Sequence, residues 1–507
     1  MSTAEAHEPP VDVSAPRSEP RRLIGTLLIA TATALALGAL LRQPTMMGAN
    51  DISRWCTIWS LLERGTYVID DCPWHPETQD KVQIPANPPQ DGPDGQPLKH
   101  YYSSKPALLP TLIAGLLYPA RTLVGVPLDR VVLQPREARW SQVPDPDHPG
   151  KVKGVLTTPD QPVKWPSYVY YFKPILILLN IIPFCGFLVL FARILDRCAR
   201  TDWAWTYSLF AAAFGTYLLP YTQTLNNHTV AAFTAFFALD QFLRIWDDGA
   251  DEGWRFALVG LLAGFTATNE LPAAAFLGLL GLALAARYPA RTIAWFVPFA
   301  ALPLLALATS QYAAFGKFKL AYEEFGTDAY EFEGSLWKTP LELDALNLPW
   351  TKPEEAARRG IVGESYAKYL LHMTLGHHGF WSLSPIFLVA AIGLVSLLRT
   401  RGRLSAVAWL TLGLTVILLA FYTWNPKARN YGGSAQGLRW LFWLIPFWLL
   451  MLPAALDAIA DRPWLRRLAV LALFVSVMSV GYAMRGPWSN PWIQDMIEHL
   501  GLYTLPR

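Results

Sequence analysis

The sequence has few charged residues for its length. Only 16% of its 507 residues are Asp, Glu, Lys or Arg, whereas 52% are hydrophobic and the mean hydropathy is +0.24. Soluble domains carry about 25% charged residues, so this chain lacks the polar side chains needed to cover a water-facing surface. The shortage of charge predicts an integral membrane protein. The net charge of +3 is small and there is no basic run, so nothing indicates a nucleic-acid partner.

Cysteine is scarce, and the common metal-binding motifs are missing. The chain has four cysteines, no CxxC pair and no HExxH, so a structural zinc site has no motif support. Cys56 and Cys72 fall in one polar segment and could form a disulfide if that segment faces an oxidising compartment. The sequence does not place these two cysteines within bonding distance, and the question stays open.

What the chain does contain is a series of apolar runs long enough to cross a bilayer. We expect an all-α polytopic membrane protein with about eleven transmembrane helices. Residues 1–22 are polar and Pro-rich and are predicted to be a disordered cytoplasmic tail. The apolar runs lie at residues 23–41, 169–192, 204–221, 229–245, 255–269, 271–287, 292–312, 385–398, 404–423, 440–459 and 468–484.

The positions of the arginines predict on which side of the membrane each connection between these runs lies. If the N-terminus is cytoplasmic and the spans alternate, the arginine-rich connections all fall on the cytoplasmic side, as the positive-inside rule requires. We therefore expect an N-terminal membrane module at 23–312 with an external loop at 42–168, a second external loop at 313–384, C-terminal helices at 385–484 and an external tail at 485–507. The arginines used are Arg17, Arg21, Arg22, Arg193, Arg197, Arg200, Arg244, Arg255, Arg287, Arg291, Arg399, Arg401, Arg403, Arg462, Arg466 and Arg467.

The apolar segment 107–126 needs a separate interpretation. If it crossed the membrane, every later loop would change sides and the arginine pattern would fail. An interfacial or re-entrant helix on the external leaflet fits better. Charges within the apolar runs are sparse, which argues against a proton relay or ion pathway.

The first external loop opens with NDISRWCTIWSLLERGTYVIDD. Its apolar residues recur at helical spacing, which predicts a short amphipathic helix on the membrane surface, with its tryptophans at headgroup depth and its end before Gly65. Asp51 stands at the start of this helix, where the local sequence favours a helix cap over a catalytic group. The apolar face consists of Ile52, Trp55, Trp59 and Leu62.

Lys105 lies in the segment KHYYSSKPALLP, directly before a proline that favours an extended or turn conformation. A lysine at this depth can bind a lipid phosphate as a compact cation. It can equally be an ordinary lysine that anchors the chain at the membrane interface. Taken alone, Lys105 fits the second interpretation better.

Other polar residues gather at the expected external ends of the helices. His228 could contact a sugar hydroxyl, act as an acid or base, or cap a helix; Asn227-His228-Thr229 also matches a glycosylation sequon, which we discount. Glu270 stands in a short turn and either has a partner between helices or faces water. The adjacent His377 and His378 do not share a helix face and make a weak metal site. Arg439, with Lys427 and Arg429, predicts an anion-binding loop or a contact to anionic headgroups.

The order of these segments resembles the membrane glycosyltransferases with the C-type superfold (GT-C). This family includes aminoarabinose transferases, protein O-mannosyltransferases and related bacterial enzymes that use polyprenyl-phosphate sugars. The resemblance covers the whole topology, but its specific motifs are short. They are NDISRW with LLERGTYVID, then YYSSKPALLP, then NYGGSAQGLRW.

The resemblance implies roles for three residues. Asp51 matches the family's catalytic base, and Lys105 and Arg439 match residues expected to contact the donor phosphate. As a carboxylate at a helix N-terminus, Asp51 is expected to have a lowered pKa and to stay ionised. Further candidates for substrate binding are Arg54, Asp70, Asp80, Lys81, Tyr102, Asn227, His228, Glu270, His378 and Tyr431.

Two departures from the family pattern affect the expected cofactors. Ile52 follows Asp51 where many relatives have a second acidic residue, and Ser104 stands where some have an acidic residue before the Lys-Pro pair. A second carboxylate must then come from Asp70, Asp71 or Asp80. A divalent metal is conceivable but has no motif support, and no other cofactor is indicated.

The expected function is inverting transfer of a sugar from a polyprenyl-phosphate donor to an acceptor hydroxyl on a lipid, glycan or protein. The expected location is the periplasmic or external face of a bacterial inner (plasma) membrane. The alternatives are a transporter or flippase of a lipid-linked sugar, or a non-catalytic subunit of a cell-envelope assembly complex. The sequence identifies neither the sugar nor the acceptor.

Overall fold

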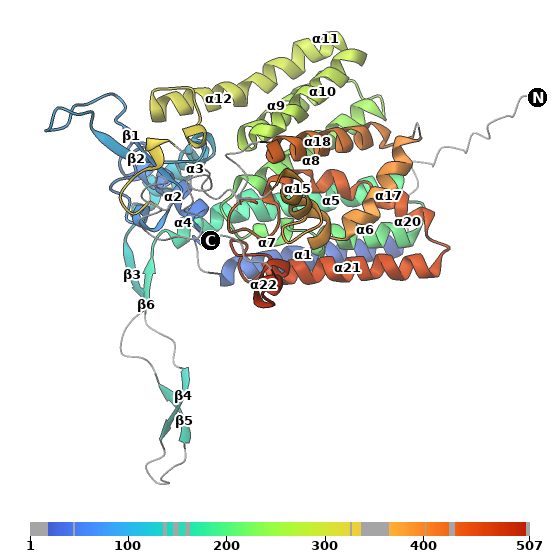
Figure 1. Cartoon of the computed structure of the whole chain (residues 1–507), viewed down its shortest axis with the longest axis horizontal. Helices are drawn as coiled ribbons and strands as arrows, with labels where there is room; N and C mark the ends of the chain where they lie inside the picture. The colour runs from blue at the N-terminus through green and yellow to red at the C-terminus, as the bar shows by residue number, and fades with distance from the viewer. Residues whose placement is uncertain are drawn as a thin grey trace, which may run out of the picture.

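The protein is largely helical, with most of its helices gathered in one elongated body (Figure 1). The structure is a computed structural model. It describes residues 19–43, 46–134, 139–144, 152–157, 163–324, 327–335, 365–400, 402–424 and 431–502.

Each predicted apolar run coincides with helical structure. Within the described residues, five helical segments are long and apolar enough to cross a membrane, or up to six if the bent pair Arg439–Leu449 and Leu452–Ala458 is one span. This fits a helical membrane protein, while the count of about eleven spans stays a prediction. The helices of the body are α1 (Glu19–Arg42), α4 (Val169–Leu176), η2 (Ile177–Ile181), α5 (Ile182–Cys198), α6 (Asp202–Phe214), α7 (Leu218–Tyr221), α8 (Asn227–Trp246), α9 (Gly253–Asn269), η3 (Leu271–Ala273), α10 (Ala274–Arg287), α11 (Pro289–Arg291), η4 (Thr292–Phe296), α12 (Val297–Phe315), α17 (Ile386–Leu398), α18 (Ser405–Trp424), η8 (Arg439–Leu444), α19 (Ile445–Leu449), α20 (Leu452–Ala458) and α21 (Pro463–Ala483).

The first helix begins earlier than predicted. α1 starts at Glu19, so residues 19–22 of the predicted disordered tail are helical. An acidic side chain in the first turn is favourable there, and a proline is tolerated. Arg21 also anchors this turn through a 2.6 Å contact to Asp202 at the start of α6. Residues 1–18 lie outside the described residues.

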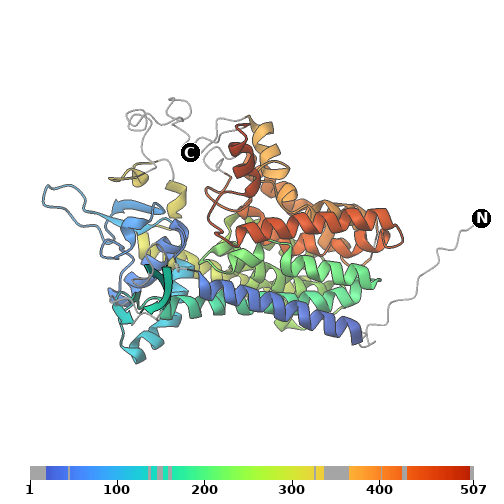
Figure 2. The same cartoon turned by 90° about the horizontal axis from the view of Figure 1, so that it is seen from below.

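Several of the smaller elements lie at one end of the body, where Figures 1 and 2 both show α2, α3 and the β1–β2 hairpin together. Strands β1 and β2 form an antiparallel hairpin. Two further antiparallel pairs, β3 with β6 and β4 with β5, extend away from the body (Figure 1). The bounds are α2 (Ala49–Glu63), η1 (His75–Glu77), β1 (Lys81–Pro85), β2 (Lys99–Ser103), α3 (Leu108–Val124), β3 (Val131–Gln134), β4 (Arg139–Pro144), β5 (Val152–Thr157), β6 (Val163–Pro166), η5 (Ala321–Glu324), η6 (Asp328–Tyr330), α15 (Tyr366–Thr374), α16 (Phe380–Leu383) and α22 (Trp492–His499).

The prediction that α2 lies on the membrane surface is wrong. All residues from Asp51 to Ser60 are buried, and Trp55 and Trp59 are 0% and 1% exposed. The Trp55 ring packs edge-on against Phe172 of α4, with the ring centroids 5.2 Å apart. Helical spacing of apolar residues shows that a helix has an apolar face, but it does not show whether lipid or protein covers that face. The predicted end of α2 is confirmed, because the helix stops at Glu63 and Gly65 has φ +69°.

α3 is the segment predicted to be interfacial. It is too short to be counted among the candidate spans, and Gly125 ends it in the left-handed conformation. Arg121 of α3 holds Glu63 of α2 through two contacts of 2.7 and 2.8 Å. The other face of α3 exposes large apolar side chains, so its interfacial position stays a prediction. These side chains are Leu112, Leu116, Tyr118, Leu123 and Val124.

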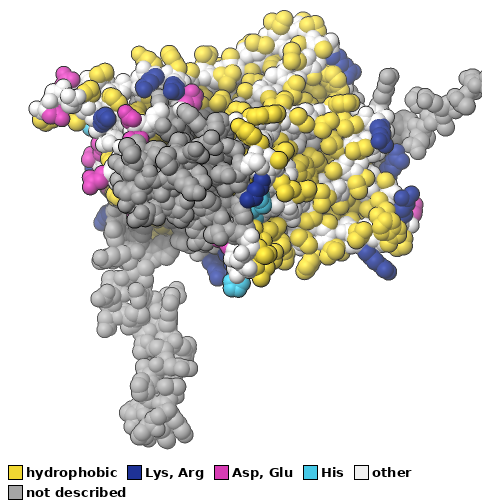
Figure 3. Space-filling view, in the orientation of Figure 1, with side chains coloured by type: hydrophobic (Ala, Val, Ile, Leu, Met, Phe, Trp, Pro, Cys, Tyr) yellow, Lys and Arg dark blue, Asp and Glu magenta, His cyan; other side chains and the backbone are white. Residues whose placement is uncertain are grey.

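The arginine-rich connections meet at the opposite end of the body. Asp248, after α8, pairs with Arg197 at the end of α5 and with Arg403 before α18. Figure 3 shows a broad hydrophobic surface over the helices, with basic side chains at this end and mixed charges at the other. α8 runs from one end to the other, and its 20 residues at ~1.5 Å each span about 30 Å, the thickness of a bilayer core.

Candidate functional site

The β1–β2 hairpin brings together two residues that are far apart in sequence. Lys81 pairs with Ser103 and the Ser104 N–H donates to the Asp80 carbonyl, so Lys105, the next residue, comes beside Asp80 at the open end, or base, of the hairpin. Their Nζ and Oδ2 atoms are 3.0 Å apart. The Ser53 hydroxyl of α2 lies 2.6 Å from that of Ser103 and donates to the Asp80 carbonyl, which fixes this base against α2. Of the three carboxylates predicted from sequence, Asp80 is therefore the one beside Lys105.

Asp51 is not the cap of α2, which corrects the local interpretation. Gly48 is the N-cap, and Asp51 lies in the first turn with its side chain directed away from its own helix. It accepts hydrogen bonds from the backbone N–H of Leu225 and, at 2.5 Å, from Nε1 of Trp488. Both donors come from elsewhere in the fold, so a tertiary contact replaces the expected cap.

Burial shifts the pKa of Asp51 in the direction opposite to the one expected. The side chain is 0% exposed, and burial raises its pKa to about 7, although the two hydrogen bonds and Arg54 oppose this. The prediction that Asp51 has a lowered pKa and stays ionised is therefore wrong, because desolvation outweighs the effect of the helix N-terminus. A carboxylate with a pKa near neutrality is suited to accept a proton.

Trp488 is the residue that sequence reasoning missed. It lies in the predicted external tail, one tryptophan among 21, and no motif marks it. Besides donating to Asp51, its ring lies 5.0 Å from the Arg439 guanidinium carbon. Trp488 therefore joins the candidate base to a candidate phosphate-binding residue.

Arg439 has no hydrogen-bond or ion-pair partner within the part of the chain that the structure describes. Its Nε is buried without a hydrogen bond, and no described carboxylate forms an ion pair with its guanidinium. Its charge contributes to lowering the pKa of both Asp80 and Lys105, so it lies within electrostatic range of the hairpin base. Buried polar groups normally have partners, and an unpaired guanidinium beside an aromatic ring indicates a place for an anion.

Arg54 links α2 to the start of α8. Its guanidinium donates to the side-chain oxygen of Asn227, to that of Asn50 at 3.1 Å and to the Leu225 carbonyl. Burial lowers the pKa of Arg54 to about 10, and the negative charge that opposes this most is that of Asp51. Arg54 stays cationic at neutral pH and adds positive charge to the site.

A buried imidazole and carboxylate complete the site on the α8–α9 side. His228 Nδ1 forms a short contact with Glu270, and both residues are about 5% exposed. Asn227 also donates to Glu270 at 2.7 Å. The prediction that Glu270 has a partner between helices is confirmed, and the solvated-turn alternative is wrong.

Lys105 and Asp80, at the open end of the hairpin, shift each other's pKa values. Burial lowers the pKa of Lys105 to about 8, against the opposing effect of Asp80. Burial alone would raise the pKa of Asp80, but the charges of Lys105 and Arg439 outweigh it, and the pKa is lowered. Asp80 therefore stays ionised near neutral pH, whereas Lys105 is close to its titration point.

Three candidate residues do not join this site. Asp70 accepts from His100 Nδ1 at 2.7 Å and from the Tyr101 N–H. Lys81 points away from Lys105, donating to the His75 carbonyl and lying over the Tyr101 ring. Tyr102 is 1% exposed and packs in the core beside Phe315. Side chains alternate along a strand, so neighbours in this segment point in different directions.

His378 and Tyr431 belong to an adjacent buried cluster. Their rings stack with centroids 5.0 Å apart, and His378 Nδ1 lies 2.6 Å from His377 Nδ1. Burial holds the pKa of His378 well below its usual range, so the ring is neutral. The following Gly432 approaches Arg439 closely, since a Cβ there would lie 3.1 Å from its Nε. Gly432 is therefore the point at which this segment meets Arg439.

No metal-binding group emerges in the described part of the chain, where no set of three or more His, Cys, Asp or Glu side chains could hold an ion. Lys427 and Arg429 of the predicted anion-binding loop lie outside the described residues.

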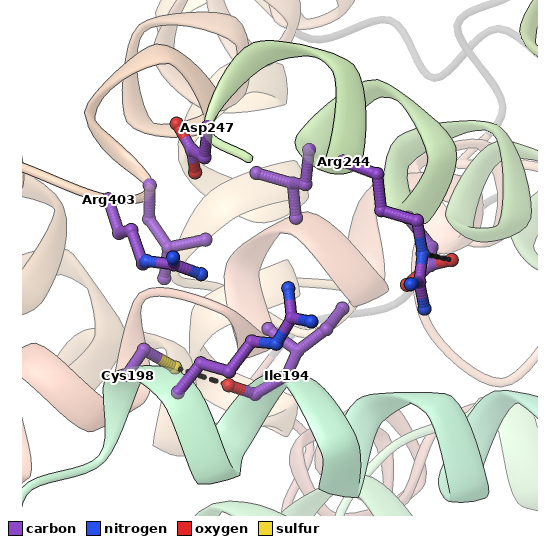
Figure 4. A pocket seen from close by; sticks show the side chains of 9 residues that line it. Ile194, Cys198, Arg244, Asp247 and Arg403 are labelled. Carbon is purple, nitrogen blue, oxygen red and sulfur yellow. Dashed lines mark hydrogen bonds and ion pairs between the residues drawn. The ribbon is translucent and has the colours of Figure 1, made fainter. Parts of the chain in front are cut away.

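A hollow at the opposite end of the body is a poorer candidate (Figure 4). Arg244, Asp247 and Arg403 line it together with Cys198, which donates to the Ile194 carbonyl. Arg244 is already paired with Asp240 and Arg403 with Asp248. The cations here are matched by carboxylates, unlike Arg439.

The contact between Gly48 and Trp488 gives a prediction about stability. A Cβ at Gly48 would lie 2.7 Å from the Trp488 ring, so Gly48→Ala must displace the ring and its hydrogen bond to Asp51. We expect a loss of stability of about 1–3 kcal/mol, measured by unfolding in detergent. Gly38→Ala is the matched control, because a Cβ there meets nothing within 4 Å. Equal stability of the two variants would contradict the packing described here.

Comparison with known proteins does not identify the chain. No protein-family model matches it. No curated protein matches it significantly either.

Proposed function

We propose that this protein is a membrane glycosyltransferase that transfers a sugar from a polyprenyl-phosphate donor to an acceptor hydroxyl with inversion. The observation that carries the proposal is the arrangement around Trp488, which contacts a carboxylate with a pKa near 7 and a guanidinium that has no hydrogen-bond or ion-pair partner among the described residues. The first group suits a general base, and the second suits a phosphate.

The chemistry needs both groups. A sugar on a polyprenyl phosphate already has a good leaving group, so catalysis requires stabilisation of the departing phosphate and activation of the acceptor. Arg439 and Lys105 place positive charge where the leaving phosphate gains negative charge. Asp51 accepts the proton of the attacking hydroxyl. Its two existing hydrogen bonds leave lone pairs free, because a carboxylate has about four acceptor positions.

The proposed setting is the external face of a bacterial plasma membrane. The cytoplasmic orientation of the arginine-rich end follows the positive-inside rule and leaves Asp51 and the hairpin outside. The exposed apolar face of α3 then lies against the outer leaflet, next to the site that the donor phosphate enters while its tail stays in lipid.

A direct assay separates transfer from the alternatives. Purified protein in liposomes is supplied with a panel of polyprenyl-phosphate sugars and a membrane extract containing acceptors. We expect release of free polyprenyl phosphate and appearance of the glycosylated acceptor, measured by mass spectrometry. An intact donor that has only changed leaflet would indicate a flippase, and an intact donor that has not moved would indicate a non-catalytic subunit.

The perturbed pKa values predict a bell-shaped dependence of kcat/KM on pH. Asp51 must be ionised to act as base, so activity should rise through a pKa of about 7. Lys105 must be protonated to attract phosphate, so activity should fall above a pKa of about 8. Lys105→Arg should remove the alkaline fall, because arginine stays charged. An alkaline limb unchanged in this variant would exclude Lys105 as its cause.

A further inference from the structure

The four cysteines divide into a close pair and two separate thiols. The Sγ atoms of Cys56, on α2, and Cys72, in the turn that follows, are 2.8 Å apart, and these residues are 0% and 1% exposed. Cys185 and Cys198 lie in α5, where the Cys198 thiol donates to the Ile194 carbonyl. The sequence left a Cys56–Cys72 bridge open because it could not bring the two residues together; the fold does so.

Both sides of the pair are held by ordered backbone. Cys56 is in the middle of α2, whose central residues are all buried. Cys72 is held by hydrogen bonds from its N–H to the Ile69 carbonyl and from the His75 N–H to its own carbonyl, each 3.0 Å long. The backbone on both sides therefore holds the two sulfurs close together.

We propose that Cys56 and Cys72 form a native disulfide that fixes α2 to the segment leading to Asp80. The proposal rests on the proposed orientation of the protein, which places this pair in an oxidising compartment, where structural disulfides persist. Each thiol loses one hydrogen atom as the S–S bond forms. The two protons and two electrons pass to an oxidised protein disulfide, which becomes a dithiol.

The timing of this step follows from burial. Burial raises the pKa of the Cys56 thiol, and disulfide exchange needs a thiolate within reach of its partner. The folded dithiol is therefore a poor substrate for an oxidant, and the bond forms while the loop is still open. Once folded, the bond is equally protected from reduction.

The disulfide would have a consequence for the site. Beyond Cys72 the chain continues through η1 to Thr78, whose hydroxyl donates to the Ala49 carbonyl at 2.8 Å, and then to Asp80. The cross-link closes a short loop against the same helix that carries Asp51. It thereby limits movement between Asp51, the proposed general base, and the ion pair of Asp80 and Lys105.

Thiol counting tests the proposal. Cells are lysed into acid to stop exchange, and the denatured protein is treated with a maleimide of high mass before and after reduction. We expect two modified thiols before reduction and four after it, since the chain has four cysteines. Without reduction, Cys56→Ala should show three modified thiols, whereas Cys185→Ala should show one. Four modified thiols before reduction of the wild type would overturn the native disulfide.

A second arm identifies the reason for such a failure. If the unoxidised wild-type protein forms the bond when refolded with oxidised glutathione, the geometry is right, but the loop faces a reducing compartment and the proposed orientation is wrong. If no bond forms even then, the geometry is wrong and the orientation is untouched. Neither result depends on sugar transfer, so failure of the disulfide and failure of the proposed activity are distinguishable.

Discussion

Asp51→Asn is expected to lower the rate of sugar transfer by about 10²–10⁴-fold while leaving donor binding nearly unchanged. The amide that replaces the carboxylate has almost the same size but cannot accept the proton of the acceptor hydroxyl. One local cost is expected, because Asp51 accepts from two donors, Leu225 N–H and Trp488 Nε1, and an amide oxygen faces only one of them. The thermal midpoint should be measured beside the rate to separate this cost from catalysis.

Asp71→Asn is the matched control for this substitution. Asp71 lies in the same loop but is largely exposed, 3.5 Å from Arg64, and takes no part in the site. We expect its transfer rate and donor affinity to equal those of the wild type. Near-normal transfer by Asp51→Asn, with the fold intact, would remove Asp51 as the general base.

Arg439→Ala is expected to weaken the binding of a short-chain polyprenyl phosphate by about 10–100-fold. Hydrogen bonds to charged groups contribute roughly 1.5–3 kcal/mol each, and the guanidinium has no described carboxylate partner with which it would otherwise be paired. The measurement is a titration of purified protein with polyprenyl phosphate. Raising the salt concentration should weaken wild-type binding more than that of the variant.

Two further variants sharpen this result. Arg439→Lys should bind with intermediate affinity, since lysine keeps the charge but loses the planar fork and much of the stacking on Trp488. Arg485→Ala is the control, because Arg485 also lies over an aromatic ring, that of Tyr482, but outside the site. Equal affinity of wild type and Arg439→Ala would exclude the proposed phosphate contact.

The two substitutions also separate the two halves of the proposed mechanism. Loss of a base should reduce kcat with little change in donor affinity, whereas loss of a phosphate contact should reduce both affinity and rate. If both variants change only the donor affinity, the site binds the donor without catalysing transfer. That result would favour the flippase alternative over the glycosyltransferase.

Much of the architecture could be predicted because it depends on local composition. A run such as residues 23–41 is predicted to be helical because its side chains are apolar and because, in lipid, a helix satisfies the backbone hydrogen bonds within the segment itself. This does not depend on the rest of the chain. The stop at Gly65 is local in the same way. Boundaries were less predictable: residues 19–22, which were expected in the disordered tail, are already helical in α1, and Arg21 contacts Asp202 there.

The candidate site was predicted in part. Asp51, Lys105 and Arg439 were selected from short motifs, and the fold brings them into one neighbourhood with Arg54 and Asp80. Asp70, Lys81 and Tyr102 were selected on residue type, and the strand geometry directs them elsewhere. A residue type shows what a side chain can do, but its direction depends on the partner strand.

The sequence by itself predicts a helical membrane protein, which the apolar helices of the structure fit, because hydropathy and arginine distribution are read directly from the residues. Only the tertiary structure decided how burial shifts the pKa values of the charged side chains. Asp51 meets Trp488 across 437 residues, and the burial that raises its pKa comes from that packing. The same holds for α2, which is covered by protein instead of lipid, and for the cysteine pair. The burial of a side chain and its distance from its partners depend on contacts between residues far apart in the sequence, so a local sequence pattern does not predict them.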